Sequence, residues 1–483
     1  MTDAQSTLRD RAFRQDLFLP DLAQIVGEAN ILRGSDADAY VVDARRRYFG
    51  QALSVVRPGD TAQVAKVVAL CAGHNVAVVP QGGNTGMCGA ATPDPDIPSI
   101  VLSLERMTRL RDLDAANGTI TVDAGCRLAT IQQAASAADK LFPMSLGSEG
   151  SCQIGGNIAT NAGGTAVLRY GPMRDLVLGL EAVLADGRTW DGLRGLRKDN
   201  TGYDLKQLFI GSEGTLGVIT GAVLKLFPKP KTSVTALVGL DTIHAALDLL
   251  GDIRGAFGDR LSTFEVMSEN EYALVLAHNS DLRDPLAQRS AWYTFIELTD
   301  SLTTIDLNTQ LADHLAHLVA LDRIRDATIA DSIAQADNIW HIRHTVTEAN
   351  LASGAGVSHD TSVPVSRVPD FVEACQRDIS ARFPDAKIYF VGHVGDGNIH
   401  VVAIFPHGAY PDAARFSALA AKVNAVVDEV TLSLNGSISA EHGIGISNRK
   451  RLEVSKDPVE LGFMRQIKSM FDPAGIMNPG KLL

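Results

Sequence analysis

Two histidines, His393 and His400, lie within the segment GHVGDGNIH, which apolar runs precede and follow. Asp-Gly is a favoured two-residue turn of a β-hairpin, so the pattern predicts two antiparallel strands with Asp396-Gly397 at the tip. Counting outward from that tip makes His393 and His400 direct cross-strand partners, with Cβ atoms ~4.5–5.5 Å apart. Two such imidazoles could chelate one metal ion, although the hairpin alone also fits a pair of half-buried structural histidines.

A carboxylate and an imidazole stand side by side at Glu441 and His442, in the small-residue segment SAEHGIG. Adding Glu441 to the two hairpin histidines gives a His₂Glu set with an open coordination position. Such a set suits Zn²⁺ or Mn²⁺ acting as a Lewis acid. A structural zinc site would instead be expected to have four protein ligands, and no cysteine motif supplies a fourth.

Three glycine-rich loops occur in the N-terminal half: PQGGNTG at 80–86, GSCQIGGN at 150–157 and GSEGTLG at 211–217. None is a GxGxxG or a GxxxxGK[ST] motif, which argues against a nicotinamide-dinucleotide fold and against an ATPase. Each loop offers successive main-chain N–H groups that could hold an anion of pyrophosphate size. One such loop would be explained by a tight turn in a β-rich domain, but three in one domain favour a large bound ligand.

The segments around these loops predict alternating strands and helices. Expected strands in the N-terminal part are 53–56, 76–80, 100–104, 119–123, 176–185 and 218–227. Asp60 is expected to cap a helix together with Gln63, and a second helix is expected at 127–139. The apolar stripe of the first helix is expected at Val64, Val67, Val68 and Cys71. The sequence PKPK at 228–231 disfavours both helix and central strand and predicts a domain boundary. Beyond it, strands at 234–240, 261–266 and 293–298 alternate with helices at 243–257 and 303–318, which predicts an α+β domain with an antiparallel sheet.

The 483-residue chain has a formal net charge of −12 at pH 7, which argues against a nucleic-acid partner. No apolar run reaches the length of about 18 residues that a membrane span needs, and no signal-peptide pattern stands at the N-terminus. Five scattered cysteines without a CxxC pair favour a reducing compartment. A cytoplasmic location is therefore expected.

The three loops, with residues 147–164 and 211–220, resemble the flavin-binding domain of the vanillyl-alcohol-oxidase, or PCMH-type, superfamily. From about residue 45 onward, the chain resembles the branch that holds D-2-hydroxyglutarate dehydrogenase, D-lactate dehydrogenase and the glycolate oxidase flavoprotein subunit. The resemblance implies an α+β fold: a helical segment at 1–48, a PCMH-type FAD-binding domain at 49–228, a substrate and metal domain at 229–408, and a mainly helical part at 409–483.

The resemblance also implies bound FAD, with its pyrophosphate over residues 82–86 and 155–157. Some relatives attach FAD through a histidine in the first loop, where this chain has Asn84 and Thr85, so non-covalent FAD is expected. The implied FAD-binding residues are Pro80, Gly82, Gly83, Asn84, Thr85, Gly86, Met87, Gly150, Ser151, Gly155, Gly156, Asn157, Thr160, Asn161, Gly214, Ile219 and Asn478.

The family's metal ligands fall on His393, His400 and Glu441, and its active-site histidine falls on His442. A 2-hydroxy acid could chelate the metal through its hydroxyl and C1 carboxylate, and the metal would lower the pKa of that hydroxyl. His442 would accept the proton while the C2 hydride passes to flavin N5. The resemblance therefore implies a dehydrogenase that forms a 2-oxo acid.

Substrate selection is expected from the helical segment 337–352, where Arg343 and Thr347 lie four residues apart and so on one face. They resemble an Arg and a Thr that grip the substrate in relatives acting on dicarboxylates, although a solvated surface Arg explains the sequence equally well. A Lys of those relatives is replaced by Ser358, and an Asn after the second metal histidine by Val402. Both D-2-hydroxyglutarate and D-lactate are therefore considered as substrates.

An external electron acceptor is also expected, either an electron-transfer flavoprotein, a quinone or a cytochrome, and a homodimer is considered. Two alternatives of other classes stay open: a non-redox synthase that uses FAD as a scaffold, and a non-catalytic electron-transfer subunit. A passive carrier would need no Lewis acid, so the metal set argues against the second alternative.

Overall fold

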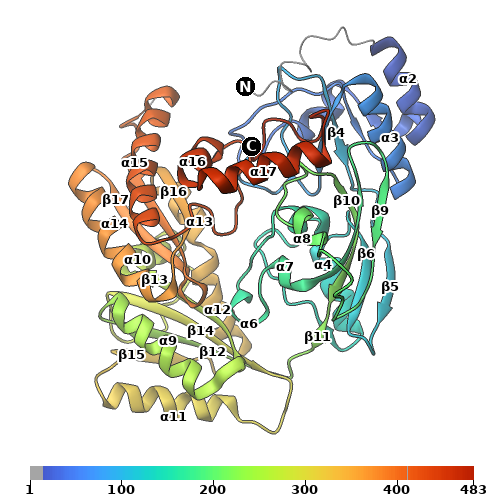
Figure 1. Ribbon diagram of the computed structural model, residues 1–483. Coiled ribbons are helices and arrows are strands. Elements are labelled where there is room, and N and C mark those ends of the chain that lie inside the picture. The colour runs from blue at the N-terminus through green and yellow to red at the C-terminus, as the bar shows by residue number, and fades with distance from the viewer. Residues whose placement is uncertain (1–14, 411) are drawn as a thin grey trace. The chain divides into compact units, whose positions relative to one another are not determined.

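The computed structural model describes residues 15–410 and 412–483 (Figure 1). The first part of the N-terminal segment expected to be helical, residues 1–14, lies outside the described residues. The chain divides into two compact units: unit 1 comprises Met1–Gly164, Gly171–Lys229 and Glu441–Leu483, and unit 2 comprises Thr165–Tyr170 and Pro230–Ala440. Within the described ranges, no helix has both the length and the hydropathy that a membrane span requires.

Unit 1 begins with a helix, α2 (Gln15–Val26), and a four-stranded sheet. Its strand order is β1 (Ile31–Leu32), β2 (Ser54–Val56), β4 (Ser99–Ser103), β3 (Ala77–Gln81), and the last three strands are parallel. The crossover helix α3 (Thr61–His74) begins as predicted, because the Asp60 side chain accepts the Gln63 N–H. The predicted apolar stripe of α3 is confirmed as buried, at Val64, Val67, Val68 and Cys71.

The second sheet of unit 1 has five antiparallel strands. Their order is β5 (Leu110–Asp114), β6 (Thr119–Asp123), β10 (Val218–Lys225), β8 (Val177–Val183), β9 (Thr189–Gly192). A charged network crosses it: Arg111 donates to Asp123 at 2.5 Å and to Glu181 at 2.8 Å. The Asp123 side chain is fully buried, so pairing with Arg111 compensates for the removal of its charge from water.

The C-terminal segment completes unit 1. Helices α16 (Arg449–Ser455) and α17 (Pro458–Phe471) precede a stretch in which Met477 bridges to Val78 of β3. The Val78 N–H donates to Ile476 O, and the Asn478 N–H donates to Val78 O, both at 2.8 Å. The last residues of the chain therefore extend the sheet beside β3, the strand that leads into the first glycine-rich loop.

Unit 2 contains one seven-stranded sheet in which every paired strand is antiparallel, as predicted. The order is β15 (Asp326–Ile329), β12 (Thr232–Leu240), β14 (Trp292–Asp300), β13 (Leu261–Ser268), β17 (Lys387–His393), β18 (Asn398–Phe405), β16 (Ala355–Ser362). The three strands predicted for this part are confirmed as β12, β13 and β14, each slightly longer than predicted.

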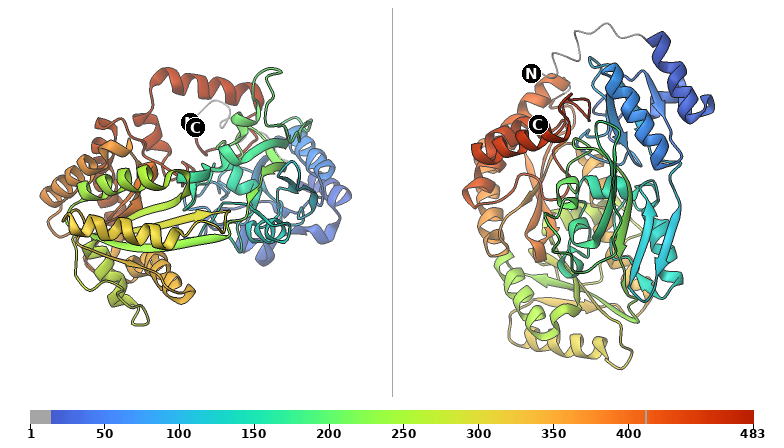
Figure 2. Two further views of the ribbon diagram at one scale, coloured as in Figure 1. Left: turned by 90° about the horizontal axis from the view of Figure 1, so that it is seen from below. Right: turned by 45° about the vertical axis from the view of Figure 1, so that its right-hand side comes forward.

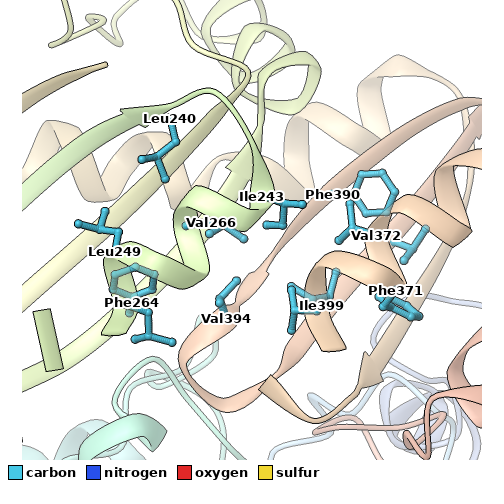
Figure 3. Close-up of a cluster of buried hydrophobic side chains, with 14 of the residues drawn as sticks. Leu240, Ile243, Leu249, Phe264, Val266, Phe371, Val372, Phe390, Val394 and Ile399 are labelled. Atoms are coloured by element: carbon cyan, nitrogen blue, oxygen red, sulfur yellow. The ribbon is translucent and has the colours of Figure 1, made fainter. Parts of the chain in front are cut away.

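Helices cover both faces of this sheet (Figure 2). On one face α9 (Ile243–Phe257), α11 (Leu307–Ala320), α14 (Val368–Arg382) and α15 (Ala413–Ser433) pack onto a large apolar cluster. Phe264, Val266, Phe390 and Ile399 belong to that cluster (Figure 3). The other face packs against α10 (Glu269–His278), α12 (Ile333–His344) and α13 (Val346–Ser353). Successive strand residues alternate between the faces, so the odd-numbered Glu265 and His393 belong to the second face.

A half-buried lysine joins the C-terminal helix of unit 1 to the third glycine-rich loop. Lys468 Nζ contacts the Asp472 carboxylate and donates to Thr215 O at 2.8 Å and to Met477 O at 2.7 Å. Asp472 in turn accepts the N–H groups of Ile476 and Met477. Burial lowers the pKa of Lys468, and Asp472 opposes that effect.

Replacing this lysine should destabilise unit 1. Lys468→Met leaves the buried Asp472 charge without its cation, and breaking a buried pair costs about 3–5 kcal/mol. Lys456→Met is the matched control, since Lys456 and Glu460 form an exposed pair with the same spacing, at 2.6 Å, and such pairs contribute ~0–1 kcal/mol. Urea unfolding followed by flavin fluorescence should show a lower midpoint in the first variant alone. Equal midpoints in both variants would contradict this role.

Candidate active site

The hairpin that carries the two histidines has a longer turn than predicted. A 3₁₀ turn, Val394–Asp396, joins β17 to β18, and Gly397 follows with φ 83°. His393 therefore pairs with Asn398 and His400 pairs with Val391, so the predicted direct pairing of the histidines is wrong by two residues. The physical reason is Val394, whose side chain is fully buried in the apolar core. Burial of this residue ends the strand pairing at His393, so residues 394–397 form the turn.

A register shift of two residues keeps side chains on the same face of a sheet. His393 and His400 are consequently diagonal neighbours rather than direct partners, with ring centroids 6.3 Å apart and ring planes at 73°. The sequence-based expectation that both imidazoles share one sheet face is therefore confirmed, although the pairing from which it was derived is not.

Glu441 joins the histidines because of the residues that precede it. Ser437 exchanges two backbone hydrogen bonds with Ser362 at the end of β16, and the Ala440 N–H donates to Asp360 O at 3.2 Å. Asp360 is the strand partner of His400. One potential ligand atom from each of His393, His400 and Glu441 lies within 4.8 Å of the others. Two ligands at ~2.1 Å from a tetrahedral zinc ion lie ~3.4 Å apart, so the set could hold a metal ion after side-chain movements of about 1 Å.

A buried carboxylate that the sequence analysis missed lies behind His393. Glu265 of β13 is fully buried, and its Oε1 lies 3.4 Å from His393 Nδ1. Its Oε2 contacts Arg343 Nε. Burial alone would raise the pKa of Glu265, but Arg343 and His393 outweigh it, so the pKa is lowered and the group is anionic. A single glutamate inside the apolar strand TFEVM was the signal that could have found it.

Carboxylates in this position commonly fix the ring orientation of a metal-binding histidine. With Nδ1 of His393 directed to Glu265, the other ring nitrogen is available as a ligand. Arg343, predicted to bind substrate, is thus also the cation that balances Glu265. It lies in the last turn of α12 with a side chain 15% exposed.

The other residues predicted to select the substrate lie near this face. Thr347 is exposed in the first turn of α13. Ser358 is exposed on β16 and pairs with Val402, which puts it on the same sheet face as His400. A second buried carboxyl group, Glu271 of α10, accepts a hydrogen bond from Asn350 at 3.3 Å, and burial raises its pKa to about 7.

The three glycine-rich loops meet within unit 1. A Cβ on Gly83 would lie 2.1 Å from Ser151 O, and one on Gly82 would lie 3.5 Å from Gly156 N, so the first two loops touch through their backbones. A Cβ on Gly214 of the third loop would lie 3.0 Å from the Pro80 ring. By contrast, Gly86, Gly150 and Gly156 have no atom near the Cβ position, so packing within the chain does not require glycine there. Space kept open in this way fits a ligand that approaches the main chain.

The polar residues predicted to bind FAD mainly hold the loops in shape. Asn84 has φ 52° and donates to Val42 O at 2.9 Å, Thr160 Oγ1 donates to Gly156 O at 3.1 Å, and Asn161 Oδ1 accepts the Arg174 N–H. Asn157 is buried, with its amide 3.5 Å from Cys152 Sγ.

The remaining predicted FAD residues are also placed. Ile219 is buried at the start of β10, Ser151 Oγ donates to Ser148 O, and Met87 O accepts a hydrogen bond from Arg47. Asn478 is buried, and its amide donates to Ala90 O and Glu213 O, which links the first and third loops. Its Oδ1 has no hydrogen-bond partner among the described residues, so a ligand in this region would find an acceptor.

A second missed residue, Glu213, controls the loop that follows His442. Its buried carboxylate accepts the N–H groups of Ile444 at 2.6 Å and Gly445 at 2.7 Å, and burial raises its pKa. The His442 ring lies next to Glu441, with Nε2 3.7 Å from Oε1. The third glycine-rich loop therefore fixes the backbone beside the predicted catalytic histidine. The sequence signal was the lone acidic residue in GSEGTLG.

Two family models match the chain. One, "FAD linked oxidases, C-terminal domain", covers residues 229–482, and the other, "FAD binding domain", covers residues 52–192. Among similar proteins, the mitochondrial D-2-hydroxyglutarate dehydrogenase of Bos taurus is 40% identical over 92% of this chain and 79% of its own length. The D-2-hydroxyglutarate dehydrogenase of Stutzerimonas stutzeri is 35% identical over 96% of this chain and 98% of its own length.

Solved structures with the same fold are more distant in sequence. p-Cresol methylhydroxylase with substrate bound gives a TM-score of 0.74 at 15% identity, covering 97% of this chain and 96% of that chain. An alkyldihydroxyacetonephosphate synthase gives 0.74 at 17% identity, covering 97% and 85%. These likenesses confirm the predicted PCMH-type α+β fold, and the family matches confirm the resemblance described from the sequence.

Two variants should weaken metal binding to different extents, the larger effect coming from loss of a proposed ligand and the smaller from loss of the carboxylate beside His393. His400→Ala removes a ligand and leaves two, which is too few for tight binding at an open site. Glu265→Gln keeps all three proposed ligands but removes the charge that faces His393 and Arg343, and loss of such an orienting group lowers metal affinity ~10–100-fold. FAD should stay bound in both variants, because the glycine-rich loops belong to unit 1.

Elemental analysis and competition with a chelator measure these affinities. Glu297→Gln is the matched control, since Glu297 is another glutamate of the same sheet and its carboxylate accepts a hydrogen bond from Ser262. Thermal unfolding shows whether loss of the Glu265 charge disturbs the fold. Full metal content in His400→Ala would refute the assignment of the ligands.

Proposed function

Because this chain belongs to the family of FAD-linked oxidases and is an FAD-dependent oxidoreductase, we propose that it oxidises a D-2-hydroxy acid to the 2-oxo acid with the help of a divalent metal ion. The observation that carries the proposal is the cluster of His393, His400 and Glu441, followed directly by His442. Relatives at 35–40% identity that are named D-2-hydroxyglutarate dehydrogenase support the substrate class.

Zn²⁺ or Mn²⁺, held by His393, His400 and Glu441, would supply a Lewis acid that lowers the pKa of the substrate hydroxyl. FAD, held by the loops of unit 1, would supply the acceptor for the C2 hydride at its N5 position.

The chain's own residues have separate tasks. Glu265 holds the His393 ring by its Nδ1 side, so the ligand nitrogen keeps one direction. His442 accepts the proton of the substrate hydroxyl, since an imidazole can act as a base near neutral pH. Glu213 holds the N–H groups of Ile444 and Gly445, which limits movement of the loop that carries His442.

The proposed substrates are D-2-hydroxyglutarate and D-lactate or a related acid. Arg343 and Thr347 would contact the side chain of the substrate. Arg343 is already paired with Glu265, and Ser358 offers no positive charge, so only a weak preference for a second carboxylate is expected. The electron acceptor, the cytoplasmic location and a homodimer stay predictions.

Coupled product analysis tests the proposal. With D-2-hydroxy acids, the metal-loaded holoenzyme should reduce an artificial electron acceptor and form one molecule of 2-oxo acid for every two electrons that the acceptor receives. Their L enantiomers should give neither product. A non-redox synthase or an electron-transfer subunit would give no such coupling. Absence of 2-oxo acid with every D-2-hydroxy acid would refute the proposed function.

His442→Ala should lower kcat and kcat/KM together by roughly 10²–10⁴, the usual contribution of one acid–base group. Metal and FAD contents should stay unchanged, because Glu441 is the proposed ligand. Steady-state kinetics and elemental analysis on the same preparation measure both effects. If the variant kept its activity and lost the metal, the roles of Glu441 and His442 would have to be exchanged.

Ser358→Lys should favour dicarboxylic substrates, because it adds a cation to the sheet face that carries His400. A second cation within ~4 Å of a carboxylate contributes up to ~4 kcal/mol of attraction before desolvation. Desolvation of the ammonium group cancels much of this, so kcat/KM for D-2-hydroxyglutarate relative to D-lactate should rise roughly tenfold, or ~1.4 kcal/mol.

Ser380→Lys is the matched control for this change. Ser380 is exposed on α14, which packs on the opposite face of the sheet. The control should leave the ratio of the two kcat/KM values as it is in the wild type. An unchanged ratio in Ser358→Lys as well would show that Ser358 does not face the substrate.

A further inference from the structure

Three consecutive arginines, Arg45, Arg46 and Arg47, stand on a tight turn of unit 1. The buried carboxylate of Asp43 fixes the turn. Its Oδ1 accepts the N–H groups of Arg47 and Tyr48, each at 2.6 Å, and its Oδ2 accepts the Arg45 N–H at 3.3 Å. Because backbone hydrogen bonds occupy this carboxylate, the turn has a rigid shape and does not depend on the arginine side chains.

Positive charge on this turn exceeds negative charge. Asp43 attracts the Arg45 side chain, and in the described part of the chain neither Arg45 nor Arg47 forms an ion pair with a carboxylate. Burial lowers the pKa of Arg45, and the neighbouring charge of Arg47 lowers it further. Two neighbouring cations with one nearby carboxylate leave a surplus of positive charge that can attract an anion, and this surplus occurs in a chain whose net charge is −12.

The turn contacts the first glycine-rich loop. Arg47 Nη2 donates to Met87 O, directly after that loop. Two residues further along the chain, the Tyr48 ring lies against Gly89, where an added Cβ would be 2.9 Å from it.

The same stretch also contacts the loop that follows His442. Cys88 Sγ donates to Gly443 O at 3.3 Å, and the Ile446 N–H donates to Cys88 O at 2.8 Å. A Cβ on Gly445 would lie 2.1 Å from Cys88 O, so the two segments touch through their backbones. Arg47 therefore contacts the segment that follows the first glycine-rich loop, and Cys88 of that segment contacts the loop that follows His442.

We infer that Arg45 and Arg47 together bind an anionic oxygen group at the active centre. Guanidinium groups match the geometry of carboxylates and phosphates through paired N–H donors. Two sources offer this chemistry: the carboxylate of the 2-hydroxy acid substrate and the pyrophosphate of FAD. The substrate source rests on the proposed function, whereas the FAD source rests only on the flavin-binding loops.

Single glutamine variants of the two arginines test the inference. Arg45→Gln and Arg47→Gln remove one charge each and keep a side chain of similar length. Arg46→Gln is the matched control, because it removes the same charge from the same turn at a residue for which no side-chain contact with the FAD loop is found. Arg45→Lys and Arg47→Lys keep the charge but not the planar fork. Circular dichroism and thermal unfolding show whether each variant is folded.

Two dissociation constants are measured for every variant. The first is that of FAD, from quenching of flavin fluorescence on titration of apoprotein. The second is that of D-2-hydroxyglutarate and D-lactate, from the concentration dependence of anaerobic flavin reduction in the holoenzyme. If the pair binds substrate, the substrate constant should rise about tenfold and lose much of its salt dependence, while the FAD constant stays unchanged. If the pair binds pyrophosphate, the FAD constant should rise about tenfold instead.

If the dissociation constants of FAD and of the 2-hydroxy acids are both unchanged in folded Arg45→Gln and Arg47→Gln, the inference is overturned. An equal effect of Arg46→Gln would overturn it as well. If no D-2-hydroxy acid reduces the flavin, the proposed function fails. The dissociation constant of FAD in the arginine variants then decides the inference by itself. The failure of one is thus distinguishable from the failure of the other.

Discussion

The buried carboxylate of Glu265 is the constraint on which the proposed metal site depends. A charge removed from water is tolerated only when it is paired, and Glu265 is paired on both sides, with Arg343 of α12 and with His393 of β17. These contacts join α12 to the seven-stranded sheet and bring a carboxylate oxygen to 3.4 Å from His393 Nδ1, from where it could orient the ring. Without Glu265, both Arg343 and His393 would be less restricted, and the three proposed ligands would hold a metal less tightly.

Unit 1 uses buried acidic residues in a similar way. Glu213 accepts two N–H groups of the loop after His442, and Asp472 accepts two N–H groups of the C-terminal segment while it contacts Lys468. Each carboxylate fixes a loop that lacks regular secondary structure. Hydrogen bonds of polar side chains such as Asn84 and Glu213 thus set the shape of these segments, so the glycines of the loops can stay open to a ligand.

The sequence predicted those features that depend on local physics. The capping of α3 by Asp60, the apolar stripe of that helix and the antiparallel sheet of unit 2 follow from short-range patterns, and the structure confirms them. The register of the histidine hairpin was wrong because Val394, a turn residue, is drawn into the core. Glu265 and Glu213 were missed because their partners are 78, 128 or more than 200 residues away, and such contacts leave no local pattern.

Anaerobic reduction of the flavin, with and without metal, tests the central claim most directly. The holoenzyme is mixed with D-2-hydroxyglutarate or D-lactate, and the visible absorbance of oxidised FAD is followed. The same protein is then measured after removal of the metal by a chelator and again after Zn²⁺ or Mn²⁺ is restored. The account predicts bleaching by a D acid but not by its L enantiomer, loss of bleaching without metal, and recovery when the metal is returned. Equal bleaching by metal-free protein, or no bleaching by any D-2-hydroxy acid, would contradict it.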